Sequence, residues 1–109
     1  MTMPSRREKI EALLADDPGD TFLRYSLALE LIKESQSQRG LALLDELMRE
    51  APAYVPAFFQ SGQILAGMGR TDEARGALRS GIEAARAAGD AHAAGEMAEF
   101  LASLGRAVE

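Results

Sequence analysis

The sequence predicts an all-α fold of antiparallel helical hairpins, with about six helices in 109 residues. Alanine, leucine, glutamate and arginine dominate while β-branched residues are scarce, which favours helix over strand. Apolar residues recur at helical spacing along most of the chain. In addition, residues 21–54 align without a gap with residues 55–88. A fixed period of 34 residues is typical of helical repeats, in which each unit buries its apolar face against a neighbour.

The two copies keep both large apolar and small residues at matched positions. The matched pairs are Leu31 with Leu65, Leu44 with Leu78, Met48 with Ile82, Ala28 with Gly62 and Gly40 with Ala74. Small side chains allow two helix backbones to approach closely, and larger residues one turn away then interlock. Glycine inside a helix is unfavourable by roughly 1 kcal/mol relative to alanine. We therefore expect Gly62 to lie at a close helix–helix contact.

Six helices are predicted, at residues 6–15, 21–34, 38–51, 54–68, 72–88 and 91–104. Ser5 with Glu8 fits a capping box at the first start, and Asp20 and Thr71 are the expected N-caps of the second and fifth helices. Pro56 suits the first turn of the fourth helix, where a missing N–H is harmless.

The predicted helix ends follow from glycine, proline and short polar stretches. Gly69 and Gly89 suit a left-handed exit, Pro52 follows the third helix, and Ser35 begins a polar turn. Residues 105–109 are expected to form a frayed tail. Connections this short make neighbouring helices antiparallel.

Composition narrows the function. The net charge of −5 argues against general nucleic-acid binding, which needs a clustered basic surface. Arg6 and Arg7 are interpreted as part of a solvated face. There is no cysteine, hence no disulfide and no thiolate metal site. No apolar run approaches a membrane span, and the N-terminus lacks the apolar stretch of a signal peptide. The expectation is a cytoplasmic protein without membrane or nucleic-acid partners.

The second repeat carries a recognisable motif. Its residues are Phe58, Ser61, Gly62, Leu65, Gly69, Asp72, Glu73, Ala74, Leu78 and Gly81. The first repeat carries the motif less completely, through Tyr25, Leu27, Ala28, Leu31, Gly40, Leu44 and Pro52. This pattern resembles the tetratricopeptide repeat (TPR) family, and the stretch from Gly69 to Ala74 is especially typical. The first repeat departs from the family pattern at Arg24 and Leu47, and Ser35 replaces the turn glycine.

The resemblance implies a TPR-like α-α superhelix in a single domain, residues 1–109. Its parts are an N-terminal half-repeat helix (6–18), repeat 1 (21–54), repeat 2 (55–88) and a C-terminal capping helix (90–104). A plain helical bundle is the rival interpretation, and the shared period makes it the weaker one.

Proteins resembling this one usually bind a peptide or protein in the concave groove lined by the first helices of successive hairpins. The corresponding positions here are Phe22, Tyr25, Leu29, Lys33, Phe59, Gln63 and Ala66. Aromatic residues often anchor interfaces, so Tyr25 and Phe59 are the leading candidates. Alternatively, both rings pack against flanking helices, including Phe100. Some relatives clamp a terminal carboxylate with a set of lysines, asparagines and an arginine at such positions, and Tyr25, Leu29, Phe59 and Gln63 supply no such set.

The chemistry of an enzyme is not evident in the sequence. His92 is the only histidine and has no cysteine or carboxylate pair near it, so we expect a surface residue and no metal. Asp72 and Glu73 begin a helix, where the dipole favours anions. With no nucleophile–base pairing and no cofactor fingerprint, we expect neither catalysis nor a cofactor.

Two functions remain after this exclusion. The first is a protein–protein interaction module, an adaptor or scaffold that captures an unidentified protein or peptide in its groove. The second is structural self-association as a homodimer through exposed repeat faces, with Tyr54, Phe58 and Phe59 as contacts. Two full repeats are close to the minimum for such an architecture.

Overall fold

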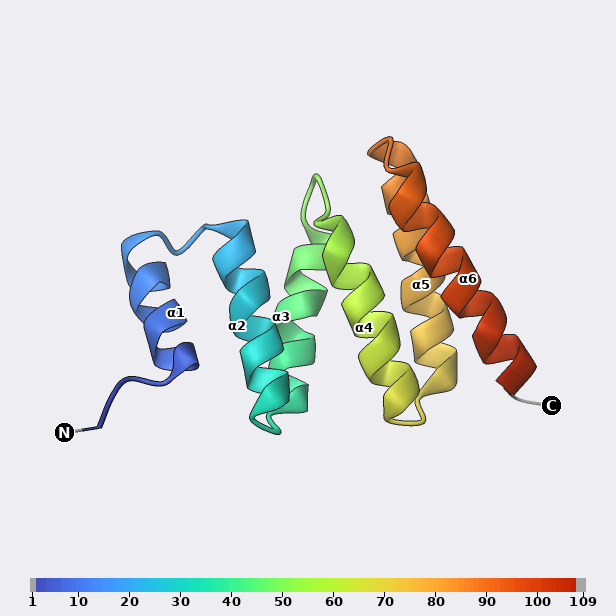
Figure 1. Cartoon of the computed structure of the whole chain (residues 1–109). Helices are drawn as coiled ribbons and strands as arrows, with labels where there is room; N and C mark the ends of the chain where they lie inside the picture. The colour runs from blue at the N-terminus through green and yellow to red at the C-terminus, as the bar shows by residue number, and fades with distance from the viewer. Residues whose placement is uncertain (1, 108–109) are drawn as a thin grey trace. The chain divides into compact units, whose positions relative to one another are not determined.

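The structure, a computed structural model, describes residues 2–107 and divides into two compact units, Met1–Arg49 and Glu50–Glu109. Each unit is described by itself. The first contains helices α1 (Arg6–Asp16), α2 (Thr21–Lys33) and α3 (Ser37–Arg49). The second contains α4 (Val55–Gly67), α5 (Thr71–Ala87) and α6 (Ala91–Ala107). No strand occurs in the described part of the chain, so the predicted all-α class is confirmed (Figure 1).

Within each unit, helices that follow one another in the sequence pack side by side. In the first unit α2 contacts both α1 and α3. In the second unit α5 contacts α4 and α6, and α4 also contacts α6. Figure 1 shows each helix of a hairpin running opposite to its neighbour, as short connections require. The predicted hairpins are therefore confirmed within both units.

The buried side chains come from the apolar stripe of each helix. In the first unit they include Ile10, Ala28, Leu31, Leu44 and Leu47. In the second unit they include Ala57, Phe58, Leu65, Ala74, Leu78, Ile82, Ala85, Ala94 and Met97. The matched pairs Leu31–Leu65 and Leu44–Leu78 are thus core residues of both copies, which explains why their character repeats.

Glycines allow the two helices of each hairpin to approach closely. A Cβ atom on Gly40 would lie 2.8 Å from the carbonyl oxygen of Ala28 and 2.5 Å from Cγ1 of Ile32. A Cβ atom on Gly62 would lie 2.7 Å from Cδ2 of Leu78. All three distances are shorter than an ordinary van der Waals contact. The predicted role of the small residues is therefore confirmed at Gly40 and Gly62.

A third close contact involves Gly81 on α5. A Cβ atom there would lie 2.5 Å from Cβ of Phe58 on α4 and 2.5 Å from Sδ of Met97 on α6. One small residue therefore lets α5 pack closely against both of its neighbours. By contrast, Gly76 and Gly95 have no foreign atom within 4 Å, and close approach does not account for them.

Three helices end in the same motif. Ser35, Gly69 and Gly89 have φ angles of 65°, 78° and 74°, in the left-handed region. The N–H of the following residue reaches back to a carbonyl in the last helical turn, as in Gln36 N to Leu31 O (2.8 Å), Arg70 N to Leu65 O (2.9 Å) and Asp90 N to Ala85 O (2.8 Å). This is the Schellman arrangement. The predicted exits at Gly69 and Gly89 are confirmed, and Ser35 adopts the same conformation without being glycine.

The substitution Ser35→Gly is expected to raise the free energy of unfolding by about 0.5–1 kcal/mol. A left-handed conformation is unfavourable by about 1–2 kcal/mol for a residue with a Cβ atom, and the greater freedom of glycine in the unfolded chain offsets part of that gain. Urea denaturation followed by circular dichroism measures the change. The matched control is Gly69→Ser, which should lower stability by a similar amount. A Ser35→Gly variant no more stable than the parent would contradict this account.

The predicted N-caps are confirmed for α1 and α2 but not for α5. The Ser5–Glu8 capping box is present, and Asp20 Oδ1 accepts from the N–H of Leu23 at 2.8 Å. The prediction of Thr71 as an N-cap is wrong. Arg70 is the N-cap, because its carbonyl accepts the first helical hydrogen bond, from the N–H of Ala74. Its side chain makes no capping hydrogen bond.

Other helix boundaries move by one to three residues. Helix α3 begins at Ser37 and ends at Arg49, not at residues 38 and 51, and α4 spans Val55–Gly67 with Tyr54 as its N-cap. Helix α6 continues through Ala107. Most of the predicted frayed tail is therefore helical, and its residues 108 and 109 lie outside the described part.

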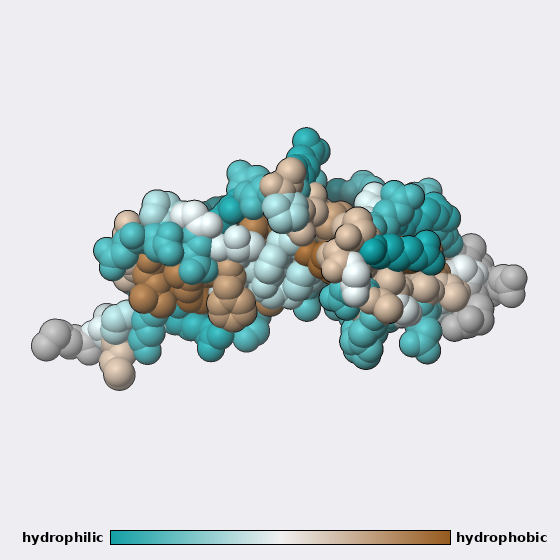
Figure 2. Space-filling model, turned by 90° about the horizontal axis from the view of Figure 1, so that it is seen from above, coloured by the Kyte–Doolittle hydropathy of each residue, from teal (hydrophilic) through white to brown (hydrophobic). Residues whose placement is uncertain are grey.

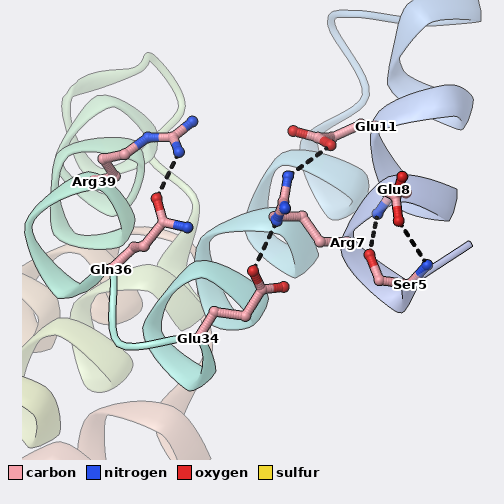
Figure 3. A network of polar contacts seen from close by, with 7 residues as sticks. All are labelled: Ser5, Arg7, Glu8, Glu11, Glu34, Gln36 and Arg39. Carbon is pink, nitrogen blue, oxygen red and sulfur yellow. Dashed lines mark hydrogen bonds and ion pairs between the residues drawn. The ribbon is translucent and has the colours of Figure 1, made fainter.

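Ion pairs link α1 to the second half of the α2 segment. Arg7 Nε lies 2.9 Å from Glu34 Oε1, and its Nη1 atom lies 3.0 Å from Glu11 Oε1 (Figure 3). The hydrogen bond and charge of Glu34 raise the pKa of Arg7 above its ordinary value. Arg6 Nε also lies 2.8 Å from Oε1 of the buried Glu30. The interpretation as a solvated face holds for Arg6, whose side chain is 74% exposed, but not for Arg7, whose side chain is 28% exposed and pairs with Glu34 at the end of α2.

The start of α1 is expected to fray in acid. In the capping box the N–H of Ser5 donates to Glu8 Oε1 at 2.9 Å (Figure 3). This bond and the Ser5 side-chain bond lower the pKa of Glu8 below its ordinary value of 4.5. A carboxyl with a depressed folded-state pKa adds stability above its unfolded pKa and loses it as pH falls through the folded value. Below about pH 4, the Ser5 amide resonance should shift, and in Glu8→Gln that titration should disappear. If the Ser5 amide still titrated in Glu8→Gln, Glu8 could not be the group that caps the start of α1.

Candidate functional site

The first candidate surface lies on α2. Phe22, Tyr25, Leu29 and Lys33 are three or four residues apart, and residues at that spacing share one helix face. Phe22 is 65% exposed, and Tyr25 and Leu29 are half-buried. Nζ of Lys33 lies 3.7 Å from Glu30 Oε1. This face therefore presents one large apolar side chain to solvent, and Figure 2 shows exposed apolar surface over the first unit.

The second candidate surface lies on α4. Phe59, Gln63 and Ala66 also follow helical spacing, with Gln63 exposed and the other two half-buried. The α2 and α4 residues belong to different units. Their union in one groove stays a prediction.

A shallow cleft lies between α4 and α6, within the second unit. Its volume is about 360 Å³, and its lining residues are Phe59, Glu96, Glu99, Phe100 and Ser103. The rings of Phe59 and Phe100 are tilted by 57°, with centroids 6.0 Å apart, a favourable aromatic geometry. The sequence left open whether Phe59 is exposed or packed against Phe100. In the structure it packs against Phe100 and remains partly exposed.

The remaining lining residues are polar and come from α6. Glu96 Oε1 lies 3.4 Å from Nε2 of the exposed His92. The hydroxyl of Ser103 donates to the carbonyl oxygen of Phe100 at 2.7 Å. The cleft thus combines two aromatic rings with two carboxylates, a combination suited to holding a side chain.

Sequence reasoning did not single out Glu96, Glu99 and Ser103. Helix α6 begins 36 residues after α4, because α5 has 17 residues where α3 has 13, while the connection after α5 is two residues shorter. The 34-residue alignment is therefore out of register here. A shift of 36 residues places Gln63 over Glu99, and this would have identified α6 as the first helix of another hairpin.

Phe58 does not reach the surface. It is 5% exposed, and its Cβ atom lies against Gly81 of α5. The suggestion that Phe58 is a homodimer contact is therefore wrong, because the close approach of α4 and α5 encloses its ring.

Metal-binding groups and membrane-spanning helices are both absent from the described residues. No group of three or more histidine or carboxylate side chains there is placed to hold a metal ion. None of the described helices combines the length and apolar character needed to cross a bilayer.

Comparison with solved structures shows close relatives. A tetratricopeptide repeat domain protein from Salinibacter ruber, solved by NMR, is 35% identical, with a TM-score of 0.75 over 81% of this chain and 89% of its own. Its crystal structure gives 34% identity and a TM-score of 0.70 over 78% and 94%. A protein from Bordetella parapertussis is 32% identical, with a TM-score of 0.80 over 95% and 90%. No family model matches the sequence, and none of the curated proteins is detectably similar.

Antiparallel hairpins with a 34-residue period and small residues at the close contacts define a helical repeat protein, the general class of protein-interaction modules. The Salinibacter ruber tetratricopeptide repeat domain, 35% identical to this chain over 89% of its own length, identifies the family within this class. The chain belongs to the tetratricopeptide repeat family.

Proposed function

We propose that the protein is an adaptor that binds a segment of another protein against the first helices of its hairpins. The observation that carries the proposal is the α4–α6 cleft, where Phe59 and Phe100 present partly apolar walls. Aromatic side chains at the centre of a contact supply much of the binding energy of interfaces. In the first unit, the exposed ring of Phe22 on α2 offers a separate apolar contact.

Self-association is the alternative. With Phe58 buried, it has Tyr54 and Phe59 as its remaining proposed contacts, and no specific observation favours it over binding of a partner. Light scattering across a dilution series separates the two, since a homodimer dissociates on dilution.

The proposal is tested by capture on the immobilised chain. The partner recovered from the native host should bind Phe59→Ala at least about tenfold more weakly, as expected for an aromatic anchor. Met68→Ala is the matched control, because Met68 is 42% exposed and does not line the cleft. Circular dichroism confirms that both variants are folded. A partner that binds Phe59→Ala and the parent equally would refute the cleft as its site.

A further inference from the structure

The charged side chains that line the α4–α6 cleft, Glu96 and Glu99, have the same sign. Glu96, Glu99 and Phe100 are spaced so that all three lie on one face of α6, with Met97 buried between them in the sequence. No lysine or arginine is among the described residues that line the cleft. Because the chain as a whole has a net charge of −5, its field also attracts cations toward this surface.

The hydrogen-bonding groups of the cleft are all acceptors. Ionised carboxylates, such as those of Glu96 and Glu99, accept hydrogen bonds and cannot donate them. The hydroxyl hydrogen of Ser103 is already used on the carbonyl of Phe100, so its oxygen has only acceptor capacity left. A ligand that satisfies these groups must therefore bring donors.

We infer that the cleft binds a basic segment of the partner, with an arginine between the two glutamates and the aromatic rings. The inference rests on the proposed function and specifies its ligand. Arginine fits better than lysine because its planar guanidinium presents several donors to carboxylates and also stacks on aromatic rings. A large apolar side chain next to that arginine would contact Phe59 and Phe100.

The same geometry excludes other ligands. A segment rich in aspartate or glutamate, or one ending in a free carboxylate at this point, would place like charges beside Glu96 and Glu99. Such juxtaposition is unfavourable and often decides which partners an interface rejects. His92 Nε2 lies 3.4 Å from Glu96 Oε1, so its side chain competes with a ligand for that carboxylate.

The experiment titrates the full ¹⁵N-labelled chain with synthetic peptides, followed by NMR. The probe is a ten-residue peptide, acetylated and amidated at its ends, in which one phenylalanine and one leucine each have arginine as neighbours. In the control peptide every arginine is replaced by citrulline, which keeps the shape of the side chain and removes its charge. The arginine peptide should shift the amides of Glu96, Glu99, Phe100 and Ser103 and bind about fivefold more tightly, the effect of two partly exposed ion pairs. Raising the salt concentration should reduce the difference in affinity between the two peptides.

Two protein variants assign the effect to the cleft. Glu96→Gln with Glu99→Gln should weaken the arginine peptide about fivefold and leave the citrulline peptide unchanged. The control, Glu46→Gln with Glu83→Gln, also changes the formal net charge from −5 to −3 but alters exposed residues of α3 and α5, and it should bind as the parent does.

Equal affinity of the two peptides, or unchanged binding of the arginine peptide to the Glu96–Glu99 variant, would overturn the inference. If both peptides still shifted the cleft amides and Phe59→Ala weakened both, the proposed binding site would stand and only its preference for arginine would fall. If neither peptide shifted them, the inference would be refuted, while capture of the native partner would still decide the proposed function.

Discussion

Truncation of Leu78 to alanine is expected to lower the free energy of unfolding by about 2–5 kcal/mol, the largest effect of any substitution considered. Leu78 is fully buried in α5, and its Cδ2 atom lies only 2.7 Å from the position that a Cβ atom on Gly62 would take. Removing it leaves a cavity between α4 and α5, and neighbouring atoms close such a cavity only in part. Urea denaturation followed by circular dichroism measures the loss.

The matched control for this truncation is Leu13→Ala. Leu13 is 56% exposed, so the same chemical change removes little buried surface and should alter stability by less than about 0.5 kcal/mol. Equal losses in the two variants would show that the contact between α4 and α5 does not depend on Leu78.

Replacement of Gly62 with leucine is expected to lower the free energy of unfolding by about 1–3 kcal/mol. The first added carbon would already lie 2.7 Å from Leu78 Cδ2, so α4 and α5 must separate to admit the rest. The matched control is Gly76→Leu on α5, where no foreign atom lies within 4 Å. There leucine only improves helix propensity, and stability should rise by about 0.5–1 kcal/mol. A thermal melt of Gly62→Leu identical to that of the parent would contradict close packing.

The two sites should also be coupled. Gly62→Ala in the parent forces a methyl group against Leu78, whereas in a Leu78→Ala background the same methyl group enters vacated space. The double variant is therefore expected to be more stable than the sum of the single changes implies, with a coupling of about 0.5–3 kcal/mol. Strict additivity would place the two residues in separate environments and would contradict the geometry.

Most of the fold could be predicted from the helical spacing of apolar residues in the sequence. Leu31, Leu65, Leu44 and Leu78 were identified as a repeating set because one face of each helix must be apolar to be buried. Helix ends were less predictable. At Thr71 a good capping residue lies inside the helix, because the connection from α4 already places the Arg70 carbonyl for the first helical bond.

The candidate site was only partly visible in the sequence. Phe59 was identified from the repeat position it occupies, and its alternative, contact with Phe100, was kept open. Glu96, Glu99 and Ser103 were missed, because the longer α5 shifts α6 by two residues relative to the 34-residue period. The ion pairs of Arg6 and Arg7 with α2 were missed as well, since spacing within α1 carries no information about the facing helix.

The amino-acid sequence by itself determined that this chain forms helical hairpins and belongs among tetratricopeptide repeats, because helix propensity, apolar spacing and small-residue positions are local properties that recur with a fixed period. Only the tertiary structure decided which side chains meet. Gly81 lies close to both Phe58 and Met97. The ring of Phe59 packs against that of Phe100, and carboxylates line the cleft beside them. Such contacts join residues far apart in the chain, and the packing of helix on helix sets their distances.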